Sequence, residues 1–228
     1  MTATRTRPHC VLNVAMSLDG KIASSARELP TFPSTEDRRR MDRIRAAADA
    51  ILIGAGTLRA ASSPLRVRSP SLLKRRQSAG KPEQPLNVLL SASLKVPERS
   101  RFFSAPDVSR LIVTTRLAPK RRRERLARRA EVLVWEGRRI GLSRLMRELF
   151  RRRIRTLLLE GGGATNFEFF RQGLVDEIYL TLCPVIIGGA ASPTPVDGAG
   201  FKPEDFARYT PVKTERVGGE FFFLYRRS

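Results

Sequence analysis

The sequence predicts one α/β domain built on a mostly parallel sheet, with an antiparallel hairpin at the C-terminus. Short apolar runs alternate with helix-like segments over residues 11–187, which is the pattern of parallel strands joined by helices. Residues 209–225 read as two strands around a Gly-Gly turn, and such a hairpin gives the sheet an antiparallel edge. With 41% hydrophobic residues the chain can bury one core, and no Gly-, Ser- or Pro-rich linker divides it. We expect one domain over residues 1–228, with residues 1–8 as a flexible basic N-terminus.

Strands are predicted where apolar runs are bounded by turn residues. They cover residues 11–18, 50–53, 86–90, 111–115, 131–135, 156–160, 177–187, 209–217 and 220–225, the seventh being interrupted at Pro184. Helices are predicted at residues 34–48, 119–130, 142–150 and 166–172. Ser34 can cap the first of these helices, and acidic residues follow in its first turn. Residues 24–33, 62–85 and 188–203 are polar or rich in Gly and Pro, so we expect loops there.

The composition excludes several kinds of site. Cys10 and Cys183 each lie inside an apolar run, so we expect core residues there and no disulfide or metal site. His9 is the single histidine, which excludes a His-rich metal site and leaves a Ser–His–Asp mechanism without a nucleophile motif beside it. No apolar run approaches the length of a membrane span, and no signal-type apolar stretch follows the N-terminus. We expect a cytoplasmic protein without a bound metal.

The chain is strongly basic, with 43 Lys and Arg against 22 acidic residues and a net charge of +21. The excess is concentrated at residues 38–40, 74–76, 120–129 and 151–153. Nucleic-acid binding is one explanation and solvated helix faces are the other. We favour solvated faces, because aromatic residues are not interleaved with the charges as stacking platforms require. A basic field would still attract small phosphorylated molecules.

Two predicted strands end in glycines at the edge where ligands gather in such sheets. One turn is Gly54-Ala55-Gly56-Thr57, and the other is Gly161-Gly162-Gly163. A strand that ends in glycines and feeds a helix brings bare N–H groups to a helix N-terminus, which suits a cofactor pyrophosphate. Neither turn matches the G-x-G-x-x-G or phosphate-loop pattern, so a tight turn that binds nothing is the alternative. Together the two turns could hold both ends of an extended cofactor.

Polar residues accompany these turns. Glu160, at the end of its strand, could bind sugar hydroxyls or support a proton transfer, or it could be an exposed strand-end acid. Asn13 interrupts an apolar strand and needs hydrogen-bond partners if buried, from a ligand or from neighbouring protein. Nothing in the local sequence distinguishes Arg45 and Arg68 from the many other arginines of the chain.

Five motifs occur in a fixed order along the chain. They are S-L-D-G-K-I-A (17–23), R-x-x-A-D-A-I-L-I-G-A-G-T (45–57), L-L-L-E-G-G-G (157–163), L-V-D-E-I (174–178) and C-P-V-I-I-G-G (183–189). Together they resemble the reductase family of riboflavin biosynthesis, over roughly residues 8–227. That reductase is the C-terminal domain of the bacterial bifunctional deaminase–reductase, and it also occurs alone in archaea and fungi.

The resemblance implies a dihydrofolate-reductase-like three-layer fold, a homodimer and NADPH as hydride donor. The implied substrate is a pyrimidine 5′-phosphate whose ribosylamino group is reduced to ribitylamino. The cofactor carries this chemistry, while the protein positions the reactants and excludes water. No zinc-deaminase signature is present, which favours the stand-alone type.

The resemblance also assigns roles to residues. Cofactor contacts are implied at Met16, Ser17, Gly54, Gly56, Thr57, Ala61, Ser91, Gly161, Gly162, Gly163, Ala164 and Thr165. Substrate contacts are implied at Ser34, Arg45, Leu65, Arg68 and Glu160, with the two arginines gripping the phosphate. Asn13 and Glu160 are the implied catalytic residues. Asn13 would face the sugar, where bifunctional enzymes tend to carry lysine and the stand-alone type carries asparagine.

The chain departs from the family pattern on the cofactor side. Before Pro64 the family usually shows acidic residues, where this chain has alanines and serines, and after the third strand the usual Asp-Ser is Ser91-Ala92. A paralogous NAD(P)H-dependent reductase acting on another heterocycle or carbonyl therefore stays open. A basic nucleic-acid-binding protein of the same fold is the third hypothesis. The amino and the deaminated pyrimidine are equally compatible with the sequence, and the positive charge favours NADPH over NADH.

Overall fold

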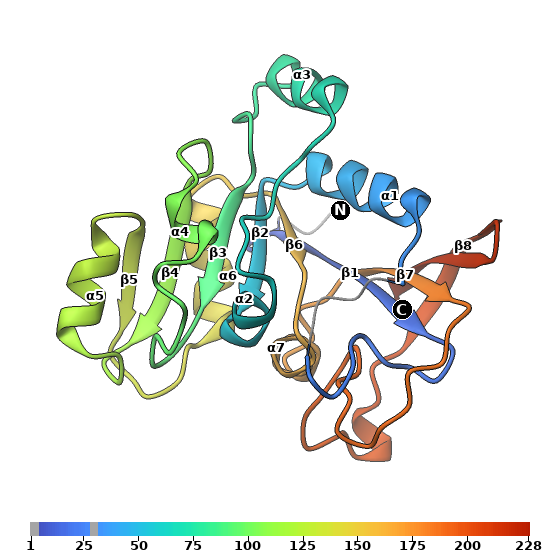
Figure 1. The fold of residues 1–228 in the computed structure, drawn as a ribbon. Helices are drawn as coiled ribbons and strands as arrows, with labels where there is room; N and C mark the ends of the chain where they lie inside the picture. Colours follow the sequence, from blue (N-terminus) through green and yellow to red (C-terminus); the bar gives the residue numbers. More distant parts are fainter. Residues whose placement is uncertain (1–4, 28–31) are drawn as a thin grey trace.

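A nine-stranded sheet forms the centre of the molecule, with strand order β5-β4-β3-β2-β6-β1-β7-β9-β8 (Figure 1). In this computed structural model, residues 5–27 and 32–228 are described. Strands β1 to β7 are parallel to one another, and β9 runs antiparallel to its neighbours β7 and β8. The prediction of an α/β domain with a mostly parallel sheet and an antiparallel C-terminal hairpin is confirmed.

The strands lie close to the predicted runs. Their bounds are β1 (His9–Ser17), β2 (Ala50–Gly54), β3 (Leu86–Leu90), β4 (Arg110–Thr115), β5 (Glu131–Trp135), β6 (Thr156–Leu159), β7 (Glu177–Cys183), β8 (Tyr209–Val217) and β9 (Glu220–Arg227). The prediction that β7 continues to Ile187 is wrong. The strand ends at Cys183 because Pro184 has no N–H group with which to continue the ladder.

The helices differ more from expectation. Their bounds are α1 (Thr35–Ala47), α2 (Ala55–Ala61), α3 (Pro70–Ser78), α4 (Arg101–Ser104), α5 (Lys120–Ala127), α6 (Leu142–Arg151) and α7 (Gly163–Arg171), with a 3-10 turn η1 (Pro203–Asp205). The predicted loop over 62–85 is wrong where α3 forms, with Pro70 at its first position. Helix α7 begins at Gly163 and not at Asn166, because the Gly162 carbonyl already accepts from the N–H groups of Thr165 and Asn166.

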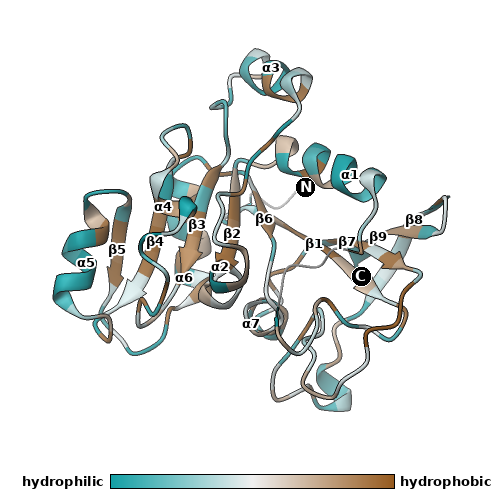
Figure 2. Ribbon diagram, in the orientation of Figure 1, coloured by the Kyte–Doolittle hydropathy of each residue, from teal (hydrophilic) through white to brown (hydrophobic). Residues whose placement is uncertain are grey.

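Helices cover both faces of the sheet, which gives three layers. Strand residues alternate between the faces, so that Ile51 packs in the cluster that includes residues of α2, α4 and α5, and Leu52 in the cluster that includes residues of α6 and α7. Helix α1 crosses the first of these faces (Figure 1). Figure 2 shows apolar strands and hydrophilic outer turns on α1, α3 and α5. Within residues 5–27 and 32–228, no helix is long and apolar enough to cross a membrane.

One arginine of the basic run 74–76 is buried, and it does not lie on a solvated helix face. Arg76 is 2% exposed, and its guanidinium donates to the carbonyl oxygens of Ala46 and Ala48 at the end of α1, at 2.8 and 2.6 Å. Burial lowers the pKa of this guanidinium. A cation at a helix C-terminus is favourable, so Arg76 fixes the end of the helix that carries Arg45.

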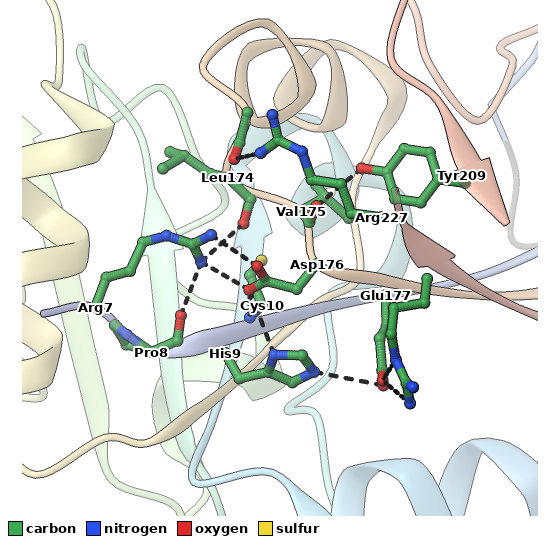
Figure 3. A network of polar contacts seen from close by, with 12 residues as sticks. Arg7, Pro8, His9, Cys10, Leu174, Val175, Asp176, Glu177, Tyr209 and Arg227 are labelled. Atoms are coloured by element: carbon green, nitrogen blue, oxygen red, sulfur yellow. Dashed lines mark hydrogen bonds and ion pairs between the residues drawn. The ribbon is translucent and has the colours of Figure 1, made fainter. Parts of the chain in front are cut away.

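A polar network ties the N-terminal segment to the start of β7 (Figure 3). The Asp176 carboxylate accepts two hydrogen bonds from the Arg7 guanidinium, both at 2.7 Å, and one from the Cys10 N–H at 2.8 Å. Burial raises the pKa of Asp176, but these bonds outweigh burial and hold the pKa below its ordinary value. Of the segment 1–8, predicted to be flexible, residues 1–4 lie outside the described residues and Arg7 is held by this network.

Replacing Asp176 by Ala leaves Arg7 without its partner, so we expect the free energy of unfolding at pH 7 to fall by about 2–4 kcal/mol. Because folding lowers the pKa of Asp176, its contribution is complete above the ordinary carboxyl pKa of about 4 and disappears as the pH falls through the lowered value. Denaturant titrations at pH 7 and pH 3 measure both effects.

The control is Glu136→Ala, which removes an exposed ion pair with Arg116 and should cost at most about 0.5 kcal/mol. A loss for Asp176→Ala that is no larger than this, or that is equal at both pH values, would contradict the role of the network.

Candidate active site

The two glycine turns predicted from the sequence meet at the carboxyl ends of β2 and β6. The Gly54 N–H donates to the Gly161 carbonyl at 2.8 Å. A Cβ on Gly54 would overlap Oγ1 of Thr165, so any side chain there would displace Thr165. A Cβ on Gly162 would lie 3.4 Å from Oγ1 of Thr57, which is an ordinary contact. Gly162 therefore lies between the two turns, but packing does not require a glycine there. The predicted juxtaposition of the turns is therefore present.

The start of α7 presents backbone donors. The N–H groups of Gly161, Gly162, Gly163 and Ala164 find no acceptor among the described residues, and Gly161 has a φ of +80°, which favours glycine. The Gly161–Gly162 peptide bond is cis. Four free N–H groups at a helix N-terminus form a cradle for an anionic group, and a nicotinamide dinucleotide pyrophosphate fits this donor set.

Glu160 follows β6 directly and is paired with Arg45 of α1. The guanidinium donates Nε and Nη2 to the two carboxylate oxygens, both at 2.7 Å, and Nη1 to the Arg66 carbonyl at 3.1 Å. Both side chains are about nine-tenths buried. Burial opposes the charge on Arg45, but Glu160 raises the pKa of the guanidinium above its ordinary value. Glu160 is thus a carboxylate held in one orientation, not an exposed strand-end acid.

Arg45, expected to bind a substrate phosphate, makes a hydrogen bond to protein from each of its three guanidinium nitrogens. Leu65, expected at the substrate, is 6% exposed and packs in the core. The buried Asn87 side chain clamps the Leu65 backbone by accepting from its N–H and donating to its carbonyl. Of this predicted group, Arg68 keeps an exposed side chain, while its N–H donates to Asp42 at 2.8 Å.

Asn13 lies in β1 on the sheet face that α1 crosses. It pairs in register with Tyr179 of β7, whose ring lies 5.4 Å from the Arg40 guanidinium of α1. The Asn13 side chain is half-buried, and its amide has no hydrogen-bond partner within the described part of the chain. An amide with unused donors and acceptors beside a buried carboxylate can bind a polar ligand.

The residues that follow in β1 are placed differently from each other. By strand alternation Met16 lies on the sheet face opposite to Asn13. Ser17 is buried and its hydroxyl is committed, since it donates to Asp19 at 2.5 Å and accepts from the Lys21 N–H at 2.9 Å. The structure therefore does not bring Met16 together with Asn13, and it gives Ser17 a turn-forming role.

Ser34 caps α1 as predicted, accepting from the Asp37 N–H at 3.1 Å. Its own N–H donates to the buried Glu220 at 2.8 Å, and its hydroxyl also bonds that carboxylate. Asp37 in turn accepts from Thr181 of β7 at 2.7 Å. The backbone N–H and the hydroxyl of Ser34 therefore both have hydrogen-bond partners within the protein. Sequence reasoning missed Glu220, because its partner Ser34 lies far away in the chain.

The remaining predicted cofactor positions lie along the same edge of the sheet. Ala61 is the last residue of α2, and Ser91 is buried just after β3, where its N–H donates to the Val113 carbonyl at 3.0 Å. Beyond them lies a cavity of about 350 Å³. Its lining residues are Ser93, Lys95, Leu117, Pro119, Arg121, Arg122 and Arg125.

A second cavity, of about 410 Å³, lies between the end of α7 and the C-terminal hairpin. None of the residues predicted for the site lines it. Within the described residues no group of three His, Cys, Asp or Glu side chains is arranged to hold a metal ion. The glycine turns, Glu160 and Asn13 therefore remain the candidate site.

Comparison with known proteins gives both fold and family. The 2,5-diamino-6-ribosylamino-4(3H)-pyrimidinone 5′-phosphate reductase of Archaeoglobus fulgidus is 38% identical, over 94% of this chain and 96% of that protein. The reductase of the same name from Methanothermobacter thermautotrophicus is 36% identical over 85% of this chain and 86% of its own length. That from Aquifex aeolicus is 34% identical over 86% and 85%.

Among solved structures, a pyrimidine reductase-like protein from Corynebacterium diphtheriae matches with a TM-score of 0.83 and 26% identity, over 97% of this chain and 92% of that chain. RibD of Acinetobacter baumannii matches with a TM-score of 0.80 and 20% identity, over 98% of this chain and 59% of that chain, which supports the fold alone. The expected dihydrofolate-reductase-like fold is confirmed. Residues 8–223 match the model of the RibD C-terminal domain. The chain therefore belongs to the RibD C-terminal domain family.

Proposed function

We propose that this chain is a nicotinamide-dependent reductase of riboflavin biosynthesis that acts on 2,5-diamino-6-ribosylamino-4(3H)-pyrimidinone 5′-phosphate. The observation that carries the proposal is the set of N–H groups at 161–164 that find no acceptor among the described residues, directly after the buried carboxylate of Glu160 in the chain. A cofactor and a polar substrate can meet at such a place.

The relatives support the diamino substrate, which the sequence left open against its deaminated form. The three reductases named for the diamino compound are 34–38% identical to this chain. Relatives named as riboflavin biosynthesis protein RibD are 26–30% identical. None of these relatives supports the paralogue or nucleic-acid hypotheses.

In the proposed mechanism a bound nicotinamide would supply a hydride to C1′ of the ring-opened imine, and the imine nitrogen would take one proton from water. The N–H groups of residues 161–164 hold the pyrophosphate, and Glu160 accepts hydrogen bonds from the sugar hydroxyls. Arg45 keeps the carboxylate in one orientation, so the hydroxyls meet a fixed acceptor. The free amide of Asn13 binds the sugar. Because Arg45 is committed to Glu160, the substrate phosphate is assigned to the exposed Arg68.

NADPH is the proposed cofactor form. Helix α2, which begins after Gly54, contacts the segment that lines the cavity after β3 and β4, since Arg59 donates to the Lys95 carbonyl at 2.9 Å. Lys95 and Arg121 line this cavity, and neither forms an ion pair in the described part of the chain. Free cations there suit the extra phosphate of NADPH. We expect NADPH to bind at least about tenfold more tightly than NADH, and the difference to shrink in Lys95→Met. Equal affinities in the unchanged chain would exclude this cofactor choice.

A homodimer is the proposed oligomeric state. On one face of β9, Phe221, Phe223 and Tyr225 form a row of stacked rings with centroids 6.3 and 6.0 Å apart. Phe221 is 39% exposed, and its partner in register on β8 is Arg216, whose guanidinium lies 5.9 Å from the Phe221 ring. An apolar sheet face of this kind suits a second copy of the chain, and light scattering measures the resulting mass.

Glu160→Gln removes the charge that Arg45 balances and one of the two acceptors toward the guanidinium. We expect kcat to fall by about 100-fold with the Kd for NADPH changed by less than about threefold. The control is Glu168→Gln, which alters an exposed acid on α7 and should leave both constants unchanged. Full turnover in Glu160→Gln would remove Glu160 from the mechanism.

Gly162→Val tests the cradle. The backbone at Gly162 has a φ of −64°, which any residue adopts, and a Cβ has ordinary contact there, so we expect the fold to persist. The isopropyl group fills the space between the turns, and the Kd for NADPH should rise more than about tenfold. Fluorescence titration measures the affinity, with the remote Gly137→Ala as control. An unchanged Kd in folded Gly162→Val would place the cofactor elsewhere.

A further inference from the structure

Residues 184–200, called here the strap, lead from the end of β7 towards the 3-10 turn η1 and pass against the first turns of α7 (Figure 1). The first residue of the C-P-V-I-I-G-G motif, Cys183, ends β7, and the other six residues of the motif belong to the strap. The strap has no regular secondary structure. Two sets of contacts fix it, one to the turn after β1 and one to α7. Since α7 begins at the N–H cradle, the strap is a wall of the proposed cofactor site.

The first set of contacts centres on Asp19. One oxygen of its carboxylate accepts from the Ile187 N–H at 3.1 Å and from the Ser17 hydroxyl at 2.5 Å, and the other accepts from the Gly188 N–H at 2.7 Å. The Ser17 hydroxyl and these N–H groups lower the pKa of Asp19 to about 2, so the carboxylate is ionised at physiological pH. An exposed acid in the S-L-D-G-K motif is therefore a junction between two motifs distant in the sequence.

Neighbouring residues strengthen this junction. The Leu18 N–H donates to the Val185 carbonyl at 2.8 Å, and the Ile22 N–H donates to the Pro193 carbonyl at 2.9 Å. The Lys21 ammonium donates to the Ser192 carbonyl at 3.4 Å. The turn after β1 thus holds the strap over most of its length.

The second set of contacts presses the strap against α7. The buried Asn166 amide donates to the Pro195 carbonyl at 2.7 Å. A Cβ on Gly163 would overlap the Asp197 carboxylate and lie 2.5 Å from the Thr194 carbonyl oxygen, so both the backbone and a side chain of the strap pack against the first turn of the helix. A Cβ on Gly198 would lie 2.5 Å from the Phe167 ring. Displacement of the strap would therefore disturb the residues that present the free N–H groups.

We propose that Asp19 is a positioning residue for dinucleotide binding, which acts through the strap on the N–H cradle at 161–164. The inference rests on the proposed function, because it takes a nicotinamide dinucleotide as the ligand. Asp19 itself touches neither reactant in this account. Its effect is to hold the wall in place before the cofactor arrives, and such preorganisation lowers the cost of binding.

Asp19→Asn tests the inference. The amide keeps one acceptor, but its NH2 group faces a backbone N–H, so one tie between the turn and the strap is lost. We expect the Kd and the KM for NADPH to rise about tenfold, while kcat at saturating cofactor stays within about twofold of its original value. Hydrogen exchange should be faster at the amides of residues 187–198.

The matched control is Asp49→Asn. The Asp49 carboxylate also accepts from two backbone N–H groups, of Arg155 and Thr156, at 2.8 and 2.9 Å, but it lies at the opposite end of β6. We expect this variant to lose thermal stability with an unchanged Kd for NADPH. Lys21→Met removes a weaker tie and should raise the Kd about threefold, which keeps the inference testable if Asp19→Asn does not fold.

The outcomes separate the inference from the function on which it rests. If the unchanged chain does not bind NADPH, the proposed function fails and the inference fails with it. If the unchanged chain binds NADPH and both Asp19→Asn and Lys21→Met bind it equally well, the inference alone is overturned. A Kd that rises equally in Asp49→Asn would also overturn it, because the effect would then follow stability and not the strap.

Discussion

The close approach of β2 and β6 at their carboxyl ends is the constraint on which the site depends. Gly54 has no space for a side chain because Thr165 of α7 lies against it, and its N–H is bound to the Gly161 carbonyl. This contact fixes where α7 begins relative to α2. It therefore sets the position of the N–H cradle and, one residue earlier, of Glu160. In an open parallel sheet such a meeting of strand ends is where ligands bind.

The buried pair of Arg45 and Glu160 is the second organising interaction. Burying two charges is costly, and a pair of this kind is weak evidence for stability, since apolar residues of similar volume often do as well. In the proposed function the pair serves the chemistry, because a sugar held during hydride transfer needs an acceptor that does not move. Helix α1 supplies the arginine, and Arg76 and Glu220 fix the two ends of that helix.

The sequence predicted the strands, the hairpin and the two glycine turns, because apolar runs and glycine punctuation are local signals. It missed α3, since the polar residues of 70–78 resemble a loop until Arg76 is seen to be buried. The sequence-based expectation was that Arg45 binds the substrate phosphate, whereas in the structure its guanidinium donates to Glu160. No local signal marks Asp19 either. Its partners are backbone N–H groups of a distant segment, which no local pattern reveals.

We propose that one sheet edge brings a nicotinamide cofactor and the ribosylamino carbon together for hydride transfer. The decisive measurement uses NADPH with deuterium at both C4 positions of the nicotinamide and 2,5-diamino-6-ribosylamino-4(3H)-pyrimidinone 5′-phosphate, followed by mass spectrometry of the product. We expect a ribitylamino product with one deuterium at C1′ for each NADPH consumed. Cofactor that binds but transfers no deuterium to this compound would overturn the proposal.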